Sequence, residues 1–106
     1  MNLYRGVLSM SKIKLKYKKG EAVRFIGHLD LVRVFYRAVR RAGLPMAYSK
    51  GFNPHPKISF GPALKLGQIS DNEFLTLHLE EDLPPEEIRK RLNAVLPTGL
   101  SLDSSL

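Results

Sequence analysis

The sequence predicts an α+β fold in which an antiparallel sheet is covered on one face by two helices. Two segments alternate apolar and polar residues as strands do, and two others carry apolar residues at helical spacing. Residues that favour turns separate these segments. The chain has 106 residues, 43% of them hydrophobic, which is enough for one domain with a modest core. We therefore expect an N-terminal extension over residues 1–11 and a single domain over residues 12–106.

The first strand is predicted at residues 12–18, because the sequence KIKLKYK alternates strictly. Its apolar side chains fall on one face, and the other face carries only lysine: Lys12, Lys14, Lys16 and Lys18. Burying four ammonium groups would be prohibitive in free energy. The lysines must therefore lie on the open face of the sheet, and the apolar side chains must meet the helices.

The first helix is predicted from about residue 29 to residue 42, where apolar residues such as Leu31 and Phe35 recur at helical spacing. A glycine followed by a proline, Gly43 and Pro45, is typical of a helix end. We expect His28 to cap the start of this helix. The side opposite the apolar stripe carries four arginines: Arg33, Arg37, Arg40 and Arg41.

The second half of the chain completes the pattern. Its predicted elements are a short strand at 44–49, a loop at 50–56, an extended segment at 57–61, a strand at 74–80, a helix that starts within 82–87 and ends at Pro97, and a last strand at 100–102. The order β-α-β-β-α-β predicts a ferredoxin-like sandwich. Its first and third strands are neighbours, so the lysine face would lie beside Phe74, Thr76 and His78.

The positive charge is concentrated in one part of the chain. The net charge is +7, and residues 11–70 hold thirteen Lys or Arg against two acids. Residues 71–106 hold three Lys or Arg against eight acids. Such segregation indicates a surface for an anionic partner, of which nucleic acid is the commonest and an acidic protein or headgroup surface the next, and we expect the cations to gather into one continuous patch. The candidate nucleic-acid-binding residues are Lys14, Lys16, Lys18, Arg33, Arg37, Arg40, Arg41, Lys50, Asn53, His55 and Lys57.

Each of these groups also has a simpler interpretation. The lysine face and the helix arginines could be ordinary solvated surfaces, although rows of like charge repel one another and favour a compensating polyanion. The loop at 49–57 is stiff because it contains glycine, asparagine and two prolines, so it could hold polar groups in fixed places. It could equally be a rigid connection with Phe52 packed inward.

Little in the sequence indicates catalysis. His28 and His55, with Tyr48 and Lys50 near them, suggest a metal-independent ribonuclease, but we assign no catalytic residue. His28 and Asp30 lack a third metal ligand, and the chain has no cysteine, so we expect neither a metal nor another cofactor. No apolar run is long enough to span a membrane, and we expect a cytoplasmic protein.

Three ungapped motifs carry a resemblance to a known family: RFIGHLDL at 24–31, RRAGLP at 40–45 and YSKGFNPHP at 48–56. The chain resembles the bacterial radical-SAM-associated domain of unknown function, which occurs alone or fused behind a radical SAM protein. The similarity covers roughly residues 12–102, and the chain resembles the N-terminal part of a longer domain. The resemblance implies a radical SAM protein as partner and a role in RNA modification or processing, with no established activity.

Three hypotheses follow. We favour a non-enzymatic accessory domain that binds RNA and serves a radical SAM or RNA-processing enzyme. The second is a protein-docking module in which the basic surface faces an acidic partner and Phe52 or Phe60 anchors it. The third, and the least favoured, is the metal-independent ribonuclease.

Overall fold

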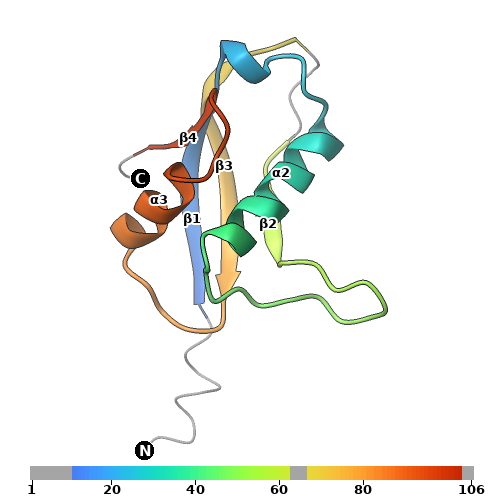
Figure 1. Ribbon diagram of the computed structural model, residues 1–106, viewed down its shortest axis with the longest axis vertical. Coiled ribbons are helices and arrows are strands. Elements are labelled where there is room, and N and C mark those ends of the chain that lie inside the picture. The colour runs from blue at the N-terminus through green and yellow to red at the C-terminus, as the bar shows by residue number, and fades with distance from the viewer. Residues whose placement is uncertain (1–10, 63–66, 104–106) are drawn as a thin grey trace, which may run out of the picture.

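The structure is a computed structural model that describes residues 11–62 and 67–103 (Figure 1). Its elements follow the predicted order, with one short 3₁₀ helix added: β1 (Ser11–Lys19), η1 (Glu21–Val23), α2 (His28–Arg41), β2 (Ile58–Phe60), β3 (Ser70–Leu79), α3 (Pro85–Asn93) and β4 (Leu100–Leu102). The four strands form one sheet in the order β2-β3-β1-β4, and all of their pairings are antiparallel. The predicted α+β fold of the ferredoxin-like type is therefore confirmed. No helix in the described part of the chain is long and apolar enough to cross a membrane.

The predicted neighbourhood of the first and third strands is also confirmed. Lys12 lies opposite His78, and Lys14 lies opposite Thr76. Lys16 lies opposite Phe74. Lys18 is the exception: the register of β1 and β3 shifts between Tyr17 and Lys19, so Lys18 has no partner on β3 and pairs only with Ser101 of β4.

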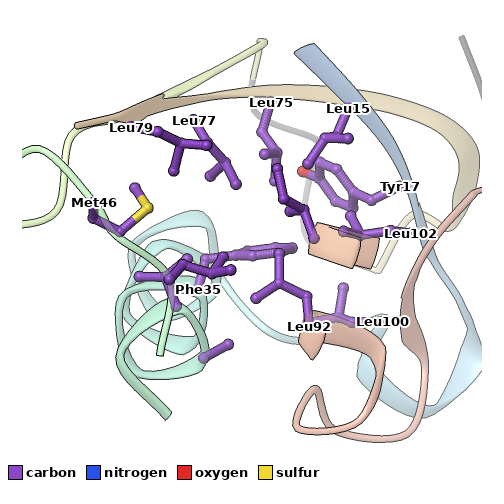
Figure 2. Close-up of a cluster of buried hydrophobic side chains, with 14 of the residues drawn as sticks. Leu15, Tyr17, Phe35, Met46, Leu75, Leu77, Leu79, Leu92, Leu100 and Leu102 are labelled. Atoms are coloured by element: carbon purple, nitrogen blue, oxygen red, sulfur yellow. The ribbon is translucent and has the colours of Figure 1, made fainter. Parts of the chain in front are cut away.

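The hydrophobic core lies between the sheet and the two helices, which cover the same face (Figures 1 and 2). Leu15 and Tyr17 of β1 and Leu77 of β3 reach it from the sheet, and Phe35 of α2 and Leu92 of α3 reach it from the helices. The rings of Tyr17 and Phe35 meet edge to face with their centroids 5.3 Å apart, an arrangement that adds about 0.5–1.5 kcal/mol to the burial of their area. Because this face of β1 is packed, its alternate residues point to the uncovered side.

The start of α2 differs from the prediction. Gly27 is the N-cap, with extended backbone and no side-chain cap, and His28 is already the first helical residue. The prediction that His28 caps the helix was therefore wrong. Its ring packs edge to face against Phe60, with the centroids 5.8 Å apart. The predicted end is confirmed, since the helix stops before Gly43, whose φ of 69° lies in the left-handed region that favours glycine.

β1 runs one residue further than predicted, and that residue is a buried lysine. Lys19 follows the alternation of the strand onto the core side, where it is only 3% exposed. Its ammonium group donates a hydrogen bond to the carbonyl of Ile26 at 3.0 Å. Lys19 therefore ties the segment before α2 to the end of the sheet and contributes nothing to the open face.

The predicted strand at 44–49 is reduced to an isolated antiparallel bridge, in which Met46 pairs with Leu79 of β3. Residues 45–57 form a narrow hairpin, here called the arm, which Figure 1 shows extending away from the sheet. Its two sides are joined by hydrogen bonds from the Lys57 N–H to the Ala47 carbonyl and from the Ser49 N–H to the His55 carbonyl, both 2.8 Å. The ladder stays short because the arm contains three prolines, which have no N–H to donate. At its tip Phe52 is 104% exposed, so the inward packing considered above is wrong.

Candidate nucleic-acid interface

The open face of the sheet carries the lysine row. This face consists of the β1 and β3 side chains that point away from both helices, together with Ser59 of β2 and Lys57, which immediately precedes β2. The β1 and β3 side chains are Lys12, Lys14, Lys16, Lys18, Phe74, Thr76 and His78. Lys12, Lys14 and Lys18 are exposed, and Lys16 is half-buried. Alternate residues of a strand are about 6.8 Å apart, so the row is about 20 Å long.

An aromatic ring lies within the lysine row. The Lys14 ammonium is 4.7 Å from the centroid of the Phe74 ring, a cation–π contact. Phe74 is half-buried, so part of its ring remains accessible. A ring bordered by cations can stack on a nucleobase while the cations contact phosphates, and this combination is typical of surfaces that bind single-stranded nucleic acid.

One carboxylate neutralises part of the row. Asp103 lies 3.8 Å from the Lys16 ammonium and 3.7 Å from that of Lys18, while its backbone N–H donates to the Lys16 carbonyl at 2.9 Å. Among the described residues, no carboxylate lies within ion-pair distance of Lys12, Lys14 or Lys57. Within the described residues, the ion pairs of the open face are therefore confined to the end that carries Lys18.

His78 is a candidate that the sequence analysis placed on this face without assigning it to the site. Its Nε2 lies 3.2 Å from the Ser59 hydroxyl oxygen. Burial lowers the pKa of His78, and the nearby charges of Lys12 and Lys57 lower it further. The imidazole is therefore neutral at neutral pH. Only the strand register brings Ser59 and Lys57 to it, so local patterns in the sequence could not have identified the group.

The helix arginines lie on the other side of the molecule. α2 covers the opposite face of the sheet, and Arg33, Arg37, Arg40 and Arg41 are all exposed on it. The expected single patch is therefore divided in two, because the packed core lies between the lysines and the arginines. Whether either set binds RNA stays a prediction.

The environments of these arginines differ. Arg33 lies 3.6 Å from Asp30, and the Arg40 guanidinium lies 5.9 Å from the centroid of the Tyr48 ring. Arg37 and Arg41 line a groove of about 490 Å³ whose other lining residues are mainly apolar: Val23, Ile26, Val34, Ala38, Val95 and Pro97. Among the described residues, no carboxylate pairs with either of these two arginines.

The arm holds most of the remaining predicted residues, and Lys50 and Asn53 are exposed near its tip. The His55 ring stacks on Tyr36 of α2, with the centroids 5.4 Å apart and the planes 5° from parallel. Tyr36 is eight residues beyond His28, about 12 Å along the helix axis. The two histidines therefore belong to different contacts, and nothing in this arrangement pairs them as a ribonuclease would require. Only Lys57 returns to the open face.

A comparison with known protein families gives a match over most of the chain. Residues 12–105 match a family described as "Uncharacterized protein conserved in bacteria (DUF2344)". The chain belongs to this family. No curated protein and no solved structure matches it.

The DUF2344 match spans all seven elements, and its description names no activity, ligand or partner. Within residues 11–62 and 67–103 the domain has no group of three or more His, Cys, Asp or Glu side chains placed to hold a metal ion. On its open face, this DUF2344 domain brings together the lysine row, the Phe74 ring and the neutral imidazole of His78.

Proposed function

We propose that this domain binds single-stranded RNA on the open face of its sheet, as an accessory domain for a radical SAM or RNA-processing protein. The observation that supports the proposal is the row of lysines beside Phe74 on the face that neither helix covers. The role as an accessory domain rests on the sequence resemblance described above.

The energies favour replacement of the Lys14–Phe74 contact by the stacking of a nucleobase on the Phe74 ring. A cation–π contact at an exposed site contributes about 0.5–1 kcal/mol. Stacking of one base on an aromatic side chain contributes about 1–3 kcal/mol. RNA can therefore displace the Lys14 ammonium from the ring, and the released ammonium is then close enough to contact the phosphate beside that base.

The test is a measurement of oligouridine affinity by fluorescence anisotropy at two salt concentrations. We expect the affinity to fall by tenfold or more between about 50 and about 200 mM salt. Phe74→Ala should weaken binding by about 1–3 kcal/mol, or roughly five- to a hundredfold. Phe52→Ala is the matched control, because it removes a fully exposed phenyl ring from the arm and should leave the affinity unchanged. Binding without a salt slope, or binding that depends on Phe52 and not on Phe74, would contradict the proposal.

A second candidate function is protein docking through the α2 and arm side. The fully exposed Phe52 and the groove lined by Arg37 and Arg41 favour an acidic partner with apolar side chains. Phe60 does not serve as an anchor, because its ring packs against Phe35 with the centroids 5.7 Å apart. Capture of the radical SAM partner that survives nuclease treatment and is lost in Phe52→Ala would support docking.

A further inference from the structure

One corner of the open face gathers polar side chains from separate strands. Lys12 of β1 lies directly opposite His78 of β3. The backbone N–H of His78 donates to the carbonyl of Lys57 at 3.0 Å, which brings Lys57 to the other side of the imidazole. Ser59 of β2 reaches the same ring with its hydroxyl, 3.2 Å from Nε2. Two ammonium groups, one hydroxyl and one imidazole therefore converge where three adjacent segments meet.

We propose that Lys12, Lys57, Ser59 and His78 form a phosphodiester-binding subsite of the open face. This inference rests on the proposed binding of RNA and names which backbone group of the RNA this corner would hold. All four side chains can donate hydrogen bonds, and no described carboxylate lies within ion-pair distance of either ammonium group. A phosphodiester presents two unbridged oxygens that share one negative charge, which suits this set of donors.

The Ser59–His78 contact leaves a donor for the ligand in either tautomer of the ring. If the Ser59 hydroxyl donates to Nε2, the proton of the neutral imidazole is on Nδ1 and is free to be donated. If Nε2 carries the proton and donates it to Ser59, the hydroxyl proton is the free one. Protonation of the ring makes both donors available at once, so the subsite has most to offer an anion when His78 is charged.

The charges around His78 predict that phosphate binding is linked to proton uptake. Lys12 faces the imidazole from β1 and Lys57 faces it from beside β2, and with burial they hold its pKa below the ordinary value of 6.5. Its neighbours on the same face of β3 are the uncharged Thr76 and, just past the strand end, Glu80. A phosphodiester offsets the two ammonium charges and so raises the pKa of His78 in the complex. Affinity must therefore increase as the pH falls from neutral into the range in which His78 takes up a proton.

The experiment compares oligouridine binding at about pH 5 and about pH 7.5 at constant ionic strength. Uracil does not titrate in this range, so a pH effect reports on the protein. We expect the wild type to bind several-fold more tightly at the lower pH, because the complex takes up a proton at His78. His78→Gln should lose this dependence while keeping a polar side chain beside Ser59. His55→Gln is the matched control and should keep the dependence, because His55 stacks on α2 away from the open face.

Each outcome has a defined meaning. If His78→Gln keeps the pH dependence of the wild type, the subsite is overturned while the RNA-binding proposal stands. If oligouridine does not bind at low salt at either pH, both proposals fail. An NMR titration of the His78 ring supplies a second readout: oligouridine should raise the pKa of His78. If oligouridine leaves the pKa of His78 unchanged, the subsite is overturned even if affinity varies with pH.

Discussion

Replacement of Asp103 by asparagine should strengthen RNA binding, although it removes two ion pairs. The Asp103 carboxylate lies 3.7–3.8 Å from the Lys16 and Lys18 ammonium groups, distances that fit loose ion pairs better than short hydrogen bonds. All three side chains are partly exposed, so the pairs contribute no more than about 1 kcal/mol to stability. Asp103→Asn should therefore fold normally and release two lysines to contact phosphates.

The expected size of the effect follows from the number of uncompensated lysines. The slope of log affinity against log salt for a single strand is about −0.7 for each phosphate neutralised. In the wild type the single charge of Asp103 offsets one of the two charges of Lys16 and Lys18, so four of the five lysine charges considered remain, which predicts a slope of about −3. Asp103→Asn restores the fifth charge and predicts a slope of about −3.5. Between about 50 and about 200 mM salt, affinity should fall by about 50-fold in the wild type and by roughly 100-fold or more in the variant.

The assay is oligouridine anisotropy over a series of salt concentrations, with Glu21→Gln as the control. Glu21 pairs with Arg24 at 2.8 Å, and its replacement changes the net charge by the same amount as Asp103→Asn does, away from the open face. Glu21→Gln should leave the slope close to that of the wild type. The reasoning is refuted if the two variants change the slope equally, or if Asp103→Asn leaves it unchanged.

Two further predictions concern the fold. Leu77→Ala removes a side chain with no exposed area from the middle of the core and should lower the free energy of unfolding by about 2–5 kcal/mol in urea titrations, whereas Leu29→Ala, at a residue 62% exposed, should change it by about 0.5 kcal/mol or less. Burial, with a smaller contribution from Glu73, raises the pKa of Tyr17 to about 12. The pKa of Tyr17 is higher in the folded than in the unfolded protein, so the neutral hydroxyl favours the folded state. This contribution to stability is complete below about pH 10 and is lost as the pH rises toward about 12. The free energy of unfolding should fall more steeply over that range in the wild type than in Tyr17→Phe, and parallel curves would contradict the assignment.

The periodicity of the sequence correctly predicted the parts of the structure that depend on residues close together in the chain. The alternation at 12–18 predicted both the strand and the uncovered lysine face, because the energetic cost of burying ammonium groups leaves no other orientation. The glycine after the first helix predicted its end for the same kind of local reason. The arm was predicted less well. Its residues have the composition of a strand followed by a loop, but only the backbone hydrogen bonds show that its base stays beside β3 while the rest pairs with itself.

The sequence by itself determined the buried and exposed faces of the first strand and the first helix and that the cations are concentrated in the first two thirds of the chain. The tertiary structure alone decided which of those cations share a surface. A side chain's face on its own strand or helix follows from backbone geometry within a few residues. The pairing of Lys12 with His78, and the distance between the lysines and the α2 arginines, depend on strand order and on the core between the layers. The pairing and the separation both result from the burial of apolar groups that lie far apart in the chain, so no local sequence pattern predicts them.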